Sequence, residues 1–198
     1  PPSRRGTRPP STPQGSIEYP VSACAFALGS GARFVARSID TLQAHLVPTL
    51  KRAHAHRGAS FVEILQNCVV FNDAVFDHIT GKEVAPEAQV LVEHGKPLLF
   101  GKNKEKGLRL KPGKLELEIV TLGDRITAAD VLVHDETNRP LAQLLATLEP
   151  PFPVAMGVLY CNPAVPYEQE VHAQVAAARG IGDLDALLNS ERTWEVTS

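Results

Sequence analysis

Apolar positions in the first third of the chain switch between a helical and a strand-like spacing. An apolar, alanine-rich run over residues 19–28 ends at Gly29 and predicts a short buried helix. Residues 34–38 then predict a strand, and residues 60–66 predict a second strand after an intervening helix. Two strands that flank a helix over short connections form a βαβ unit, which indicates a parallel sheet.

The helix between these strands is predicted to reach about His56. Its apolar residues recur every three or four positions and predict one buried stripe: Leu42, Leu46, Leu50 and Ala53. Asp40 or Thr41 can cap its amino end. Pro48 interrupts the pattern, so we expect the helix to bend there or to begin late.

The chain beyond residue 80 is broken by glycines into shorter elements. Alternating Leu and Glu predict a half-exposed strand over residues 115–122. The other predicted elements are strands at 131–134 and 154–160 and helices at 140–148, 167–179 and 183–188, the last capped by Asp183. These scattered elements predict a small α+β extension that packs on another surface rather than a large independent core.

Composition and charge limit the classes of function. The 198 residues are 43% hydrophobic and 21% charged, with a formal net charge of −2, as in an ordinary globular protein. Nucleic acid and membrane are therefore not expected partners. No apolar run approaches the ~20 residues that span a bilayer, and the proline-rich start lacks the apolar core of a signal peptide. We expect a cytoplasmic protein, and a first residue other than Met fits a fragment or a processed chain.

The three cysteines are the main candidates for chemistry. Cys24, Cys68 and Cys161 are odd in number and widely spaced, which does not suit a disulfide framework. Each is either a packed thiol or a redox or metal ligand. Cys68 lies just after the second predicted strand, where parallel sheets gather their functional loops. Glu63, inside that apolar strand, is predicted to pair with a buried or partly buried cation, with a catalytic role as the alternative.

Five segments, by their order and spacing, resemble the beta subunit of 2-oxoacid:ferredoxin oxidoreductases, in the type that uses 2-oxoglutarate. The third segment is the most specific, because it joins a strand ending in Gln-Asn-Cys to a following Phe-Asn-Asp. The segments are residues 11–16, 32–37, 58–68 with 71–73, 94–97, and 156–160 with 182–184 and 193–194. Gln66-Asn67 resembles the 2-oxoglutarate branch, whereas pyruvate-using relatives tend to have Ser-Pro there.

The resemblance implies a fold and a reaction. The fold would be α/β, with residues 1–73 completing a thiamine-diphosphate-binding parallel-sheet domain and residues 74–198 forming a small α+β carboxy-terminal extension. The reaction would decarboxylate a 2-oxoacid on thiamine diphosphate with Mg²⁺, pass the acyl group to coenzyme A and send electrons through 4Fe–4S clusters to ferredoxin. The implied protein partners are an alpha subunit, a second beta subunit and ferredoxin.

The resemblance also assigns a role to Cys68. In the family, a cysteine at the matching position is the fourth ligand of a 4Fe–4S cluster, and the other three ligands lie in the amino-terminal half. Iron in such clusters is held by thiolates, which agrees with a cysteine in a loop at a strand end. Residue types alone leave a buried structural thiol as the alternative. Cys24 and Cys161 match no ligand position and are expected to be packed thiols.

The family's thiamine motif is missing from the chain. Gly123-Asp124 is an isolated pair without a matching downstream Asn, and the other cluster cysteines are also absent. No catalytic or thiamine-binding residue is therefore assigned, and the isolated chain is expected to be inactive. The competing hypothesis is a non-catalytic interaction or assembly module that was retained after loss of the enzymatic half.

A local basic stretch runs from Lys102 to Lys114. Such a stretch can guide acidic ferredoxin or the phosphates of coenzyme A. The alternative, which we favour on the residues alone, is a solvated loop. Trp194, close to the carboxyl end, is expected to anchor the tail on a neighbouring surface.

Overall fold

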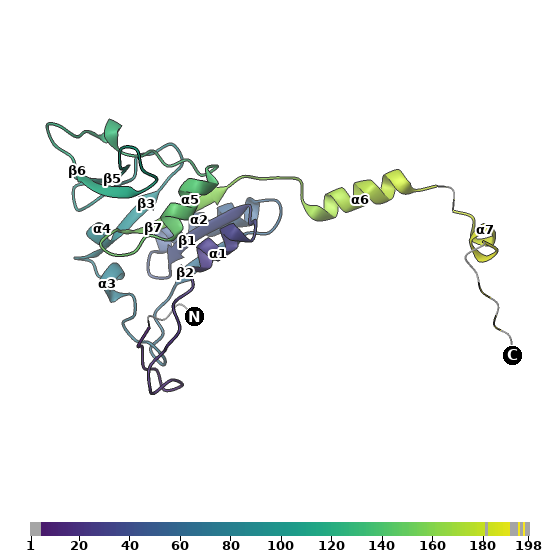
Figure 1. The fold of residues 1–198 in the computed structure, drawn as a ribbon, viewed down its shortest axis with the longest axis horizontal. Coiled ribbons are helices and arrows are strands. Elements are labelled where there is room, and N and C mark those ends of the chain that lie inside the picture. The colour runs from purple at the N-terminus through teal and green to yellow at the C-terminus, as the bar shows by residue number, and fades with distance from the viewer. Residues whose placement is uncertain (1–4, 181, 191–193, 195, 197–198) are drawn as a thin grey trace. The chain divides into compact units, whose positions relative to one another are not determined.

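A computed structural model describes residues 5–180, 182–190, 194 and 196 (Figure 1). The chain divides between Ala164 and Val165 into two compact units. The first unit contains both sheets and the whole hydrophobic core, and the second contains two helices. The predicted α/β class is confirmed.

The larger sheet has four strands in the order β2-β1-β7-β3. Their bounds are β1 Phe34–Ile39, β2 Phe61–Leu65, β3 Gln89–Val92 and β7 Val154–Cys161. β1 and β2 pair in parallel, which confirms the predicted βαβ unit. β7 runs antiparallel to β1 and parallel to β3, so the complete sheet is mixed. Strands from both sides of residue 73 thus share one sheet, and the division at residue 73 stays a prediction.

Helices cover both faces of this sheet: α1 Ala23–Gly29, α2 Gln43–Ala55 and α5 Arg139–Ala146. Successive residues of a strand point to opposite faces. Phe34 and Ala36 of β1 pack with Ala53 of α2, whereas Val35 belongs to the cluster that contains Leu145 of α5. All six residues of β1 are buried, as expected for a strand covered on both sides.

α2 differs from its prediction at two points. Its amino-terminal cap is Leu42, which makes no side-chain hydrogen bond, so the expected cap by Asp40 or Thr41 is wrong. Pro48 lies inside the helix, and the bend expected there stays a prediction. The buried residues are Leu46 and Thr49, and Leu50 is 40% exposed, so the predicted stripe is only partly correct.

A second, antiparallel sheet has the order β4-β5-β6 and shares the main core. It consists of β4 Leu99–Phe100, β5 Lys106–Leu110 and β6 Leu117–Thr121. The strand expected at 115–122 is confirmed as β6. The basic stretch from Lys102 to Lys114 was expected to be a solvated loop, but it contains β5. The strand expected at 131–134 is wrong, because Val133 makes only an isolated bridge to Pro97. Short turns of helix complete the unit: α3 Asp77–Thr80, α4 Ala85–Ala88 and a 3-10 turn at Ala128–Asp130.

The second unit carries α6 Tyr167–Ala178 and α7 Leu184–Leu188, which confirms both predicted helices. The Asp183 carboxylate caps α7 by accepting a hydrogen bond from the Ala186 amide at 3.0 Å. Neither helix has a buried residue. Trp194 is 84% exposed, so its role as an anchor stays a prediction. Among the described residues, no helix combines the length and the apolar character needed to cross a membrane.

Candidate functional site

The loop that carries Cys68 follows β2 at one edge of the larger sheet. Since β1 and β2 are parallel, their carboxyl ends lie side by side at the same end of the sheet. There the Asp40 amide donates to the Leu65 carbonyl at 3.1 Å. Residues at the carboxyl ends of parallel strands commonly form binding sites. The structure therefore places Cys68 where the sequence predicted it, in the loop after the second strand.

The neck of this loop is closed by hydrogen bonds. The Asn67 side-chain amide donates to the Asp73 carboxylate at 2.8 Å, and the Ala74 amide donates to the same oxygen at 2.9 Å. Inside the neck, the Asn72 amide donates to the Cys68 carbonyl at 2.8 Å. The Asn67–Asp73 pair was not predicted. Its one signal in the sequence is an Asn and an Asp that bracket Cys68 at short range.

The far end of the loop is fixed by packing. Ile79 of α3 is buried, and it packs with Ile39, Leu65 and the half-buried Phe76 in a small apolar cluster beneath the sheet edge. This cluster holds the loop from its carboxyl side while β2 holds it from its amino side. The backbone around Cys68 is thus defined at both ends by the first unit's own core.

The tip of the loop is apolar and exposed. Cys68 is exposed, and Val69, Val70 and Phe71 are 74%, 67% and 56% exposed. An accessible thiol beside apolar side chains suits a ligand of an iron–sulfur cluster, because such clusters need thiolates and protection from water. The described residues contain no group of three His, Cys, Asp or Glu side chains that could hold a metal ion. The loop therefore offers one ligand, and a complete cluster needs thiolates from elsewhere.

Glu63 pairs with a buried cation, as the sequence predicted. Its carboxylate lies 2.6 Å from the Arg37 guanidinium, and the Cys24 thiol lies 3.3 Å from the same carboxylate. The pKa of the Cys24 thiol is raised to about 12. Burial is the main cause, the Glu63 carboxylate adds to the rise, and the Arg37 guanidinium opposes it. Cys24 is fully buried, so it is a packed thiol, as expected.

Cys161 ends the central strand β7 beside the amino end of β1, at the opposite end of the sheet from the Cys68 loop, and it is half-buried. Burial raises the pKa of its thiol, and the nearby Glu136 carboxylate raises it further. Glu136 is itself bound by Arg52, with the two closest charged atoms 2.8 Å apart. A thiol whose pKa is raised is a poor nucleophile and a poor metal ligand at neutral pH.

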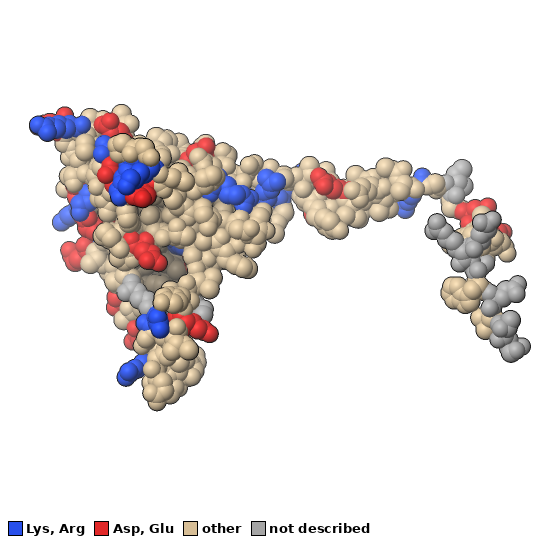
Figure 2. All heavy atoms as spheres, in the orientation of Figure 1, with Lys and Arg blue, Asp and Glu red and all other residues tan. Residues whose placement is uncertain are grey.

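Three of the six basic residues in the stretch from Lys102 to Lys114 form ion pairs with carboxylates. Lys106 contacts Glu87 at 2.7 Å, Arg109 contacts Glu118 at 2.6 Å, and Lys111 contacts Glu116 at 2.9 Å. Figure 2 shows basic and acidic side chains interspersed on the face in view. Such pairing weakens the field that would steer an acidic partner, so a docking role for this stretch stays a prediction.

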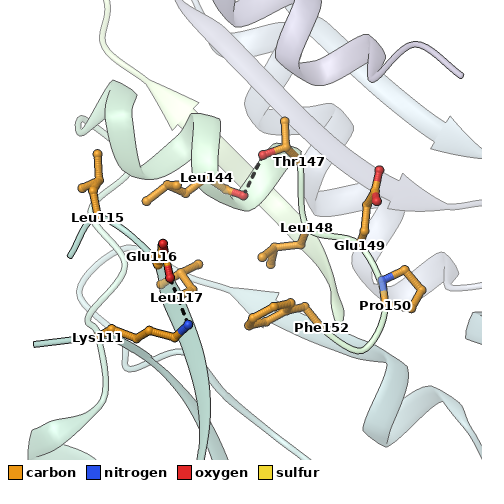
Figure 3. A pocket seen from close by; sticks show the side chains of 10 residues that line it. All are labelled: Lys111, Leu115, Glu116, Leu117, Leu144, Thr147, Leu148, Glu149, Pro150 and Phe152. Atoms are coloured by element: carbon orange, nitrogen blue, oxygen red, sulfur yellow. Dashed lines mark hydrogen bonds and ion pairs between the residues drawn. The ribbon is translucent and has the colours of Figure 1, made fainter. Parts of the chain in front are cut away.

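A shallow hollow of about 450 Å³ lies between the β5–β6 hairpin and the carboxyl end of α5 (Figure 3). The Lys111–Glu116 ion pair lies on one side of the hollow. The rest of the lining is mainly apolar and includes Leu115, Leu117, Leu144, Leu148 and Phe152. No cysteine or histidine lines it. The hollow therefore lacks the donor groups of a cluster or of an acid–base site.

Comparisons with known proteins show extended similarity to one kind of oxidoreductase subunit. The chain is 36% identical over 205 aligned positions to 2-oxoglutarate oxidoreductase subunit KorB of Mycobacterium tuberculosis; the alignment covers 99% of this chain and 54% of that protein. It is 39% identical over 70 residues to 2-oxoacid:ferredoxin oxidoreductase 1, subunit beta, of Aeropyrum pernix, which covers 35% of this chain and 22% of that protein. No family model matches the chain.

A solved structure shares the fold. It is the 2-oxoglutarate:ferredoxin oxidoreductase from Magnetococcus marinus with 2-oxoglutarate, coenzyme A and succinyl-CoA bound. The TM-score is 0.62 at 18% identity, over 94% of this chain and 49% of that chain. The chain therefore spans about half the length of the proteins it matches, and its match lies in the carboxy-terminal portion of the Mycobacterium relative.

Proposed function

Because this chain is homologous to the carboxy-terminal portion of 2-oxoacid:ferredoxin oxidoreductase beta subunits, we propose that it works as part of such a subunit in a cytoplasmic enzyme. The substrate would be 2-oxoglutarate or a related 2-oxoacid. Carbon dioxide would be released, the acyl group would pass to coenzyme A, and electrons would pass singly to ferredoxin. Support comes from the length of the Mycobacterium match, which covers 99% of this chain.

Thiamine diphosphate with Mg²⁺ would supply the electron sink for decarboxylation, and 4Fe–4S clusters would supply the one-electron steps. In this proposal, the relatives' amino-terminal portion provides the thiamine site and the remaining cluster thiolates. An alpha subunit and a second beta subunit complete the enzyme.

The role proposed for this chain is to supply Cys68 as a cluster ligand. The observation that carries this role is the exposed thiol on a loop whose neck is closed by the Asn67–Asp73 hydrogen bond. Cys24 and Cys161 are poorer candidates, because burial raises the pKa of both thiols. A neutral thiol must lose its proton before it can bind iron, and a raised pKa opposes that loss.

The proposal is tested by producing this chain together with the amino-terminal portion of the Mycobacterium relative and measuring iron and visible absorbance. Cys68→Ser should lose iron and absorbance, while Cys24→Ser and Cys161→Ser should retain both. Unchanged iron content in the Cys68 variant would refute the ligand role.

A further inference from the structure

One edge of the larger sheet is left open. β2 is the last strand in the order β2-β1-β7-β3, and its backbone pairs with β1 on one side only. No other described strand lies on its outer side. An unpaired edge presents a row of N–H and C=O groups, and proteins usually protect such an edge with Lys, Pro, a bulge or a covering segment.

β2 lacks most of the devices that protect a natural edge. Its sequence is Phe-Val-Glu-Ile-Leu, without Lys or Pro. Its single charged residue, Glu63, points inward to the ion pair with Arg37, and this inward charge is its one protective feature. Ile64 is 41% exposed although Ile is typical of buried strands. The composition is that of an interior strand, which indicates that another segment lies beside it in the assembled protein.

Exposed apolar side chains gather in the two segments that border this strand. One segment leads into α1, which packs against β2, and the other continues from β2 into the Cys68 loop. Eight large apolar side chains of these segments, of α1 and of β2 itself are more than a third exposed: Ile17, Tyr19, Val21, Phe26, Ile64, Val69, Val70 and Phe71. Grouped exposed apolar residues mark interaction surfaces, whereas single ones are normal.

From these observations, we infer that the open edge of β2 and its two apolar borders form the docking surface for the amino-terminal portion of the beta subunit. This inference rests on the proposed function and names the surface through which that portion joins the chain. The length of the Mycobacterium relative supports the choice of occupant, because 54% of that protein is matched and its amino-terminal portion is not. A strand from that portion pairs with β2, and its apolar side chains cover Phe26 and the tip of the Cys68 loop.

The arrangement explains why an exposed thiol stands among exposed apolar residues. Once the amino-terminal portion covers the loop tip, water is excluded around Cys68 without any change in this chain's fold. Exclusion of water is one of the factors that set the reduction potential of an iron–sulfur cluster. The same docking step thus closes the sheet and encloses the thiol.

The test uses this chain, tagged, produced with the amino-terminal portion of the Mycobacterium relative as the probe. We expect the two to co-purify and the backbone amides of residues 61–71 to become protected from hydrogen exchange. Phe26→Lys and Val70→Lys should each reduce recovery of the probe by about tenfold, the factor that 1.4 kcal/mol corresponds to. Both side chains are largely exposed, at 70% and 67%, so these variants should fold like the parent chain.

Matched controls use exposed apolar residues elsewhere on the first unit. Leu115→Lys and Val133→Lys, at positions 71% and 49% exposed, should recover the probe like the parent. Absence of a complex, equal recovery with the Phe26 and Val70 variants, or protection of residues 61–71 through self-association of this chain alone would overturn the inference. None of these readouts depends on iron, so failure of the Cys68 ligand role and failure of this docking surface are distinguishable.

Discussion

At the scale of single residues, the three thiols differ in environment rather than in chemistry. Cys68 is exposed on a loop, Cys161 is half-buried beside Glu136, and Cys24 is fully buried beside Glu63. The thiolate is the reactive form of cysteine, and burial disfavours it. Accessibility therefore favours Cys68 as the site of chemistry, and the raised pKa values of the Cys24 and Cys161 thiols disfavour those two.

Thiol alkylation should reflect this order. At pH 8, iodoacetamide should modify Cys68 of the folded chain first and Cys161 more slowly, and Cys24 should stay unmodified until denaturant is added. The physical reason is access, together with the pKa of Cys24, which burial raises to about 12. Peptide mass spectrometry over a time course measures the order, and early modification of Cys24 would contradict the buried environment described here.

High pH should weaken the fold through Cys24. The pKa of this thiol is raised on folding from an ordinary value of 9.0 to about 12. Since the unfolded thiol ionises first, the neutral thiol's contribution to stability is complete below pH 9 and is lost as the pH rises toward 12. The free energy of unfolding should therefore fall less between pH 8 and pH 10 in Cys24→Ala than in the parent. Parallel slopes in the two proteins would count against this assignment.

The Arg37–Glu63 pair should be costly to break. The two side chains are 9% and 18% exposed, so Glu63→Ala leaves an unpaired guanidinium in a largely dry site. We expect a loss of about 3–5 kcal/mol in the free energy of unfolding, measured by denaturant titration.

The matched control for that pair is Glu87→Ala, which breaks the pair of Glu87 with Lys106. Those side chains are 44% and 36% exposed, so the expected loss is at most about 1 kcal/mol. Equal losses in the two variants would show that burial of the Arg37–Glu63 pair has no energetic consequence.

At the scale of elements, the βαβ unit could be predicted because its apolar spacing is regular and its connections are short. The β4 and β5 strands could not: β4 has only two residues, and Lys106 and Arg109 gave β5 the composition of a solvated loop. Lys106 is paired with Glu87, 19 residues earlier, and Arg109 is paired with Glu118, which faces it from the neighbouring strand β6. The central, antiparallel place of β7 was also unpredictable, because strand order depends on contacts that the spacing of residues along one chain does not encode.

Gly157 is the element-level position most sensitive to substitution. It lies in β7 with φ +132°, and a Cβ there would come within 2.5 Å of the Val92 carbonyl oxygen of β3. Gly157→Ala should therefore push β3 and β7 apart and lower the free energy of unfolding by about 1–3 kcal/mol. Gly123→Ala, where a Cβ meets no atom within 4 Å, is the control and should change stability by less than about 0.5 kcal/mol. Similar losses in both variants would refute the close approach of the two strands.

At the scale of the whole molecule, the first unit has a continuous core together with an open sheet edge. Its core connects both sheets, yet one sheet edge and the loop that carries Cys68 are open. The loop's place at the strand end could be predicted from the sequence. Its exposure could not, because exposure depends on which segments are present to cover it. The proposed enzyme would account for both features, since the segment that closes the sheet would also bring the other cluster ligands to Cys68.

The most direct test of this account is to look for iron bonded to residue 68. Selenocysteine would replace Cys68 in the chain assembled with the relatives' amino-terminal portion, and X-ray absorption would be recorded at the selenium edge. We predict an iron atom in the first coordination shell of selenium. A selenium atom with only carbon as its bonded neighbour, in an assembly that contains a full complement of iron, would contradict the account.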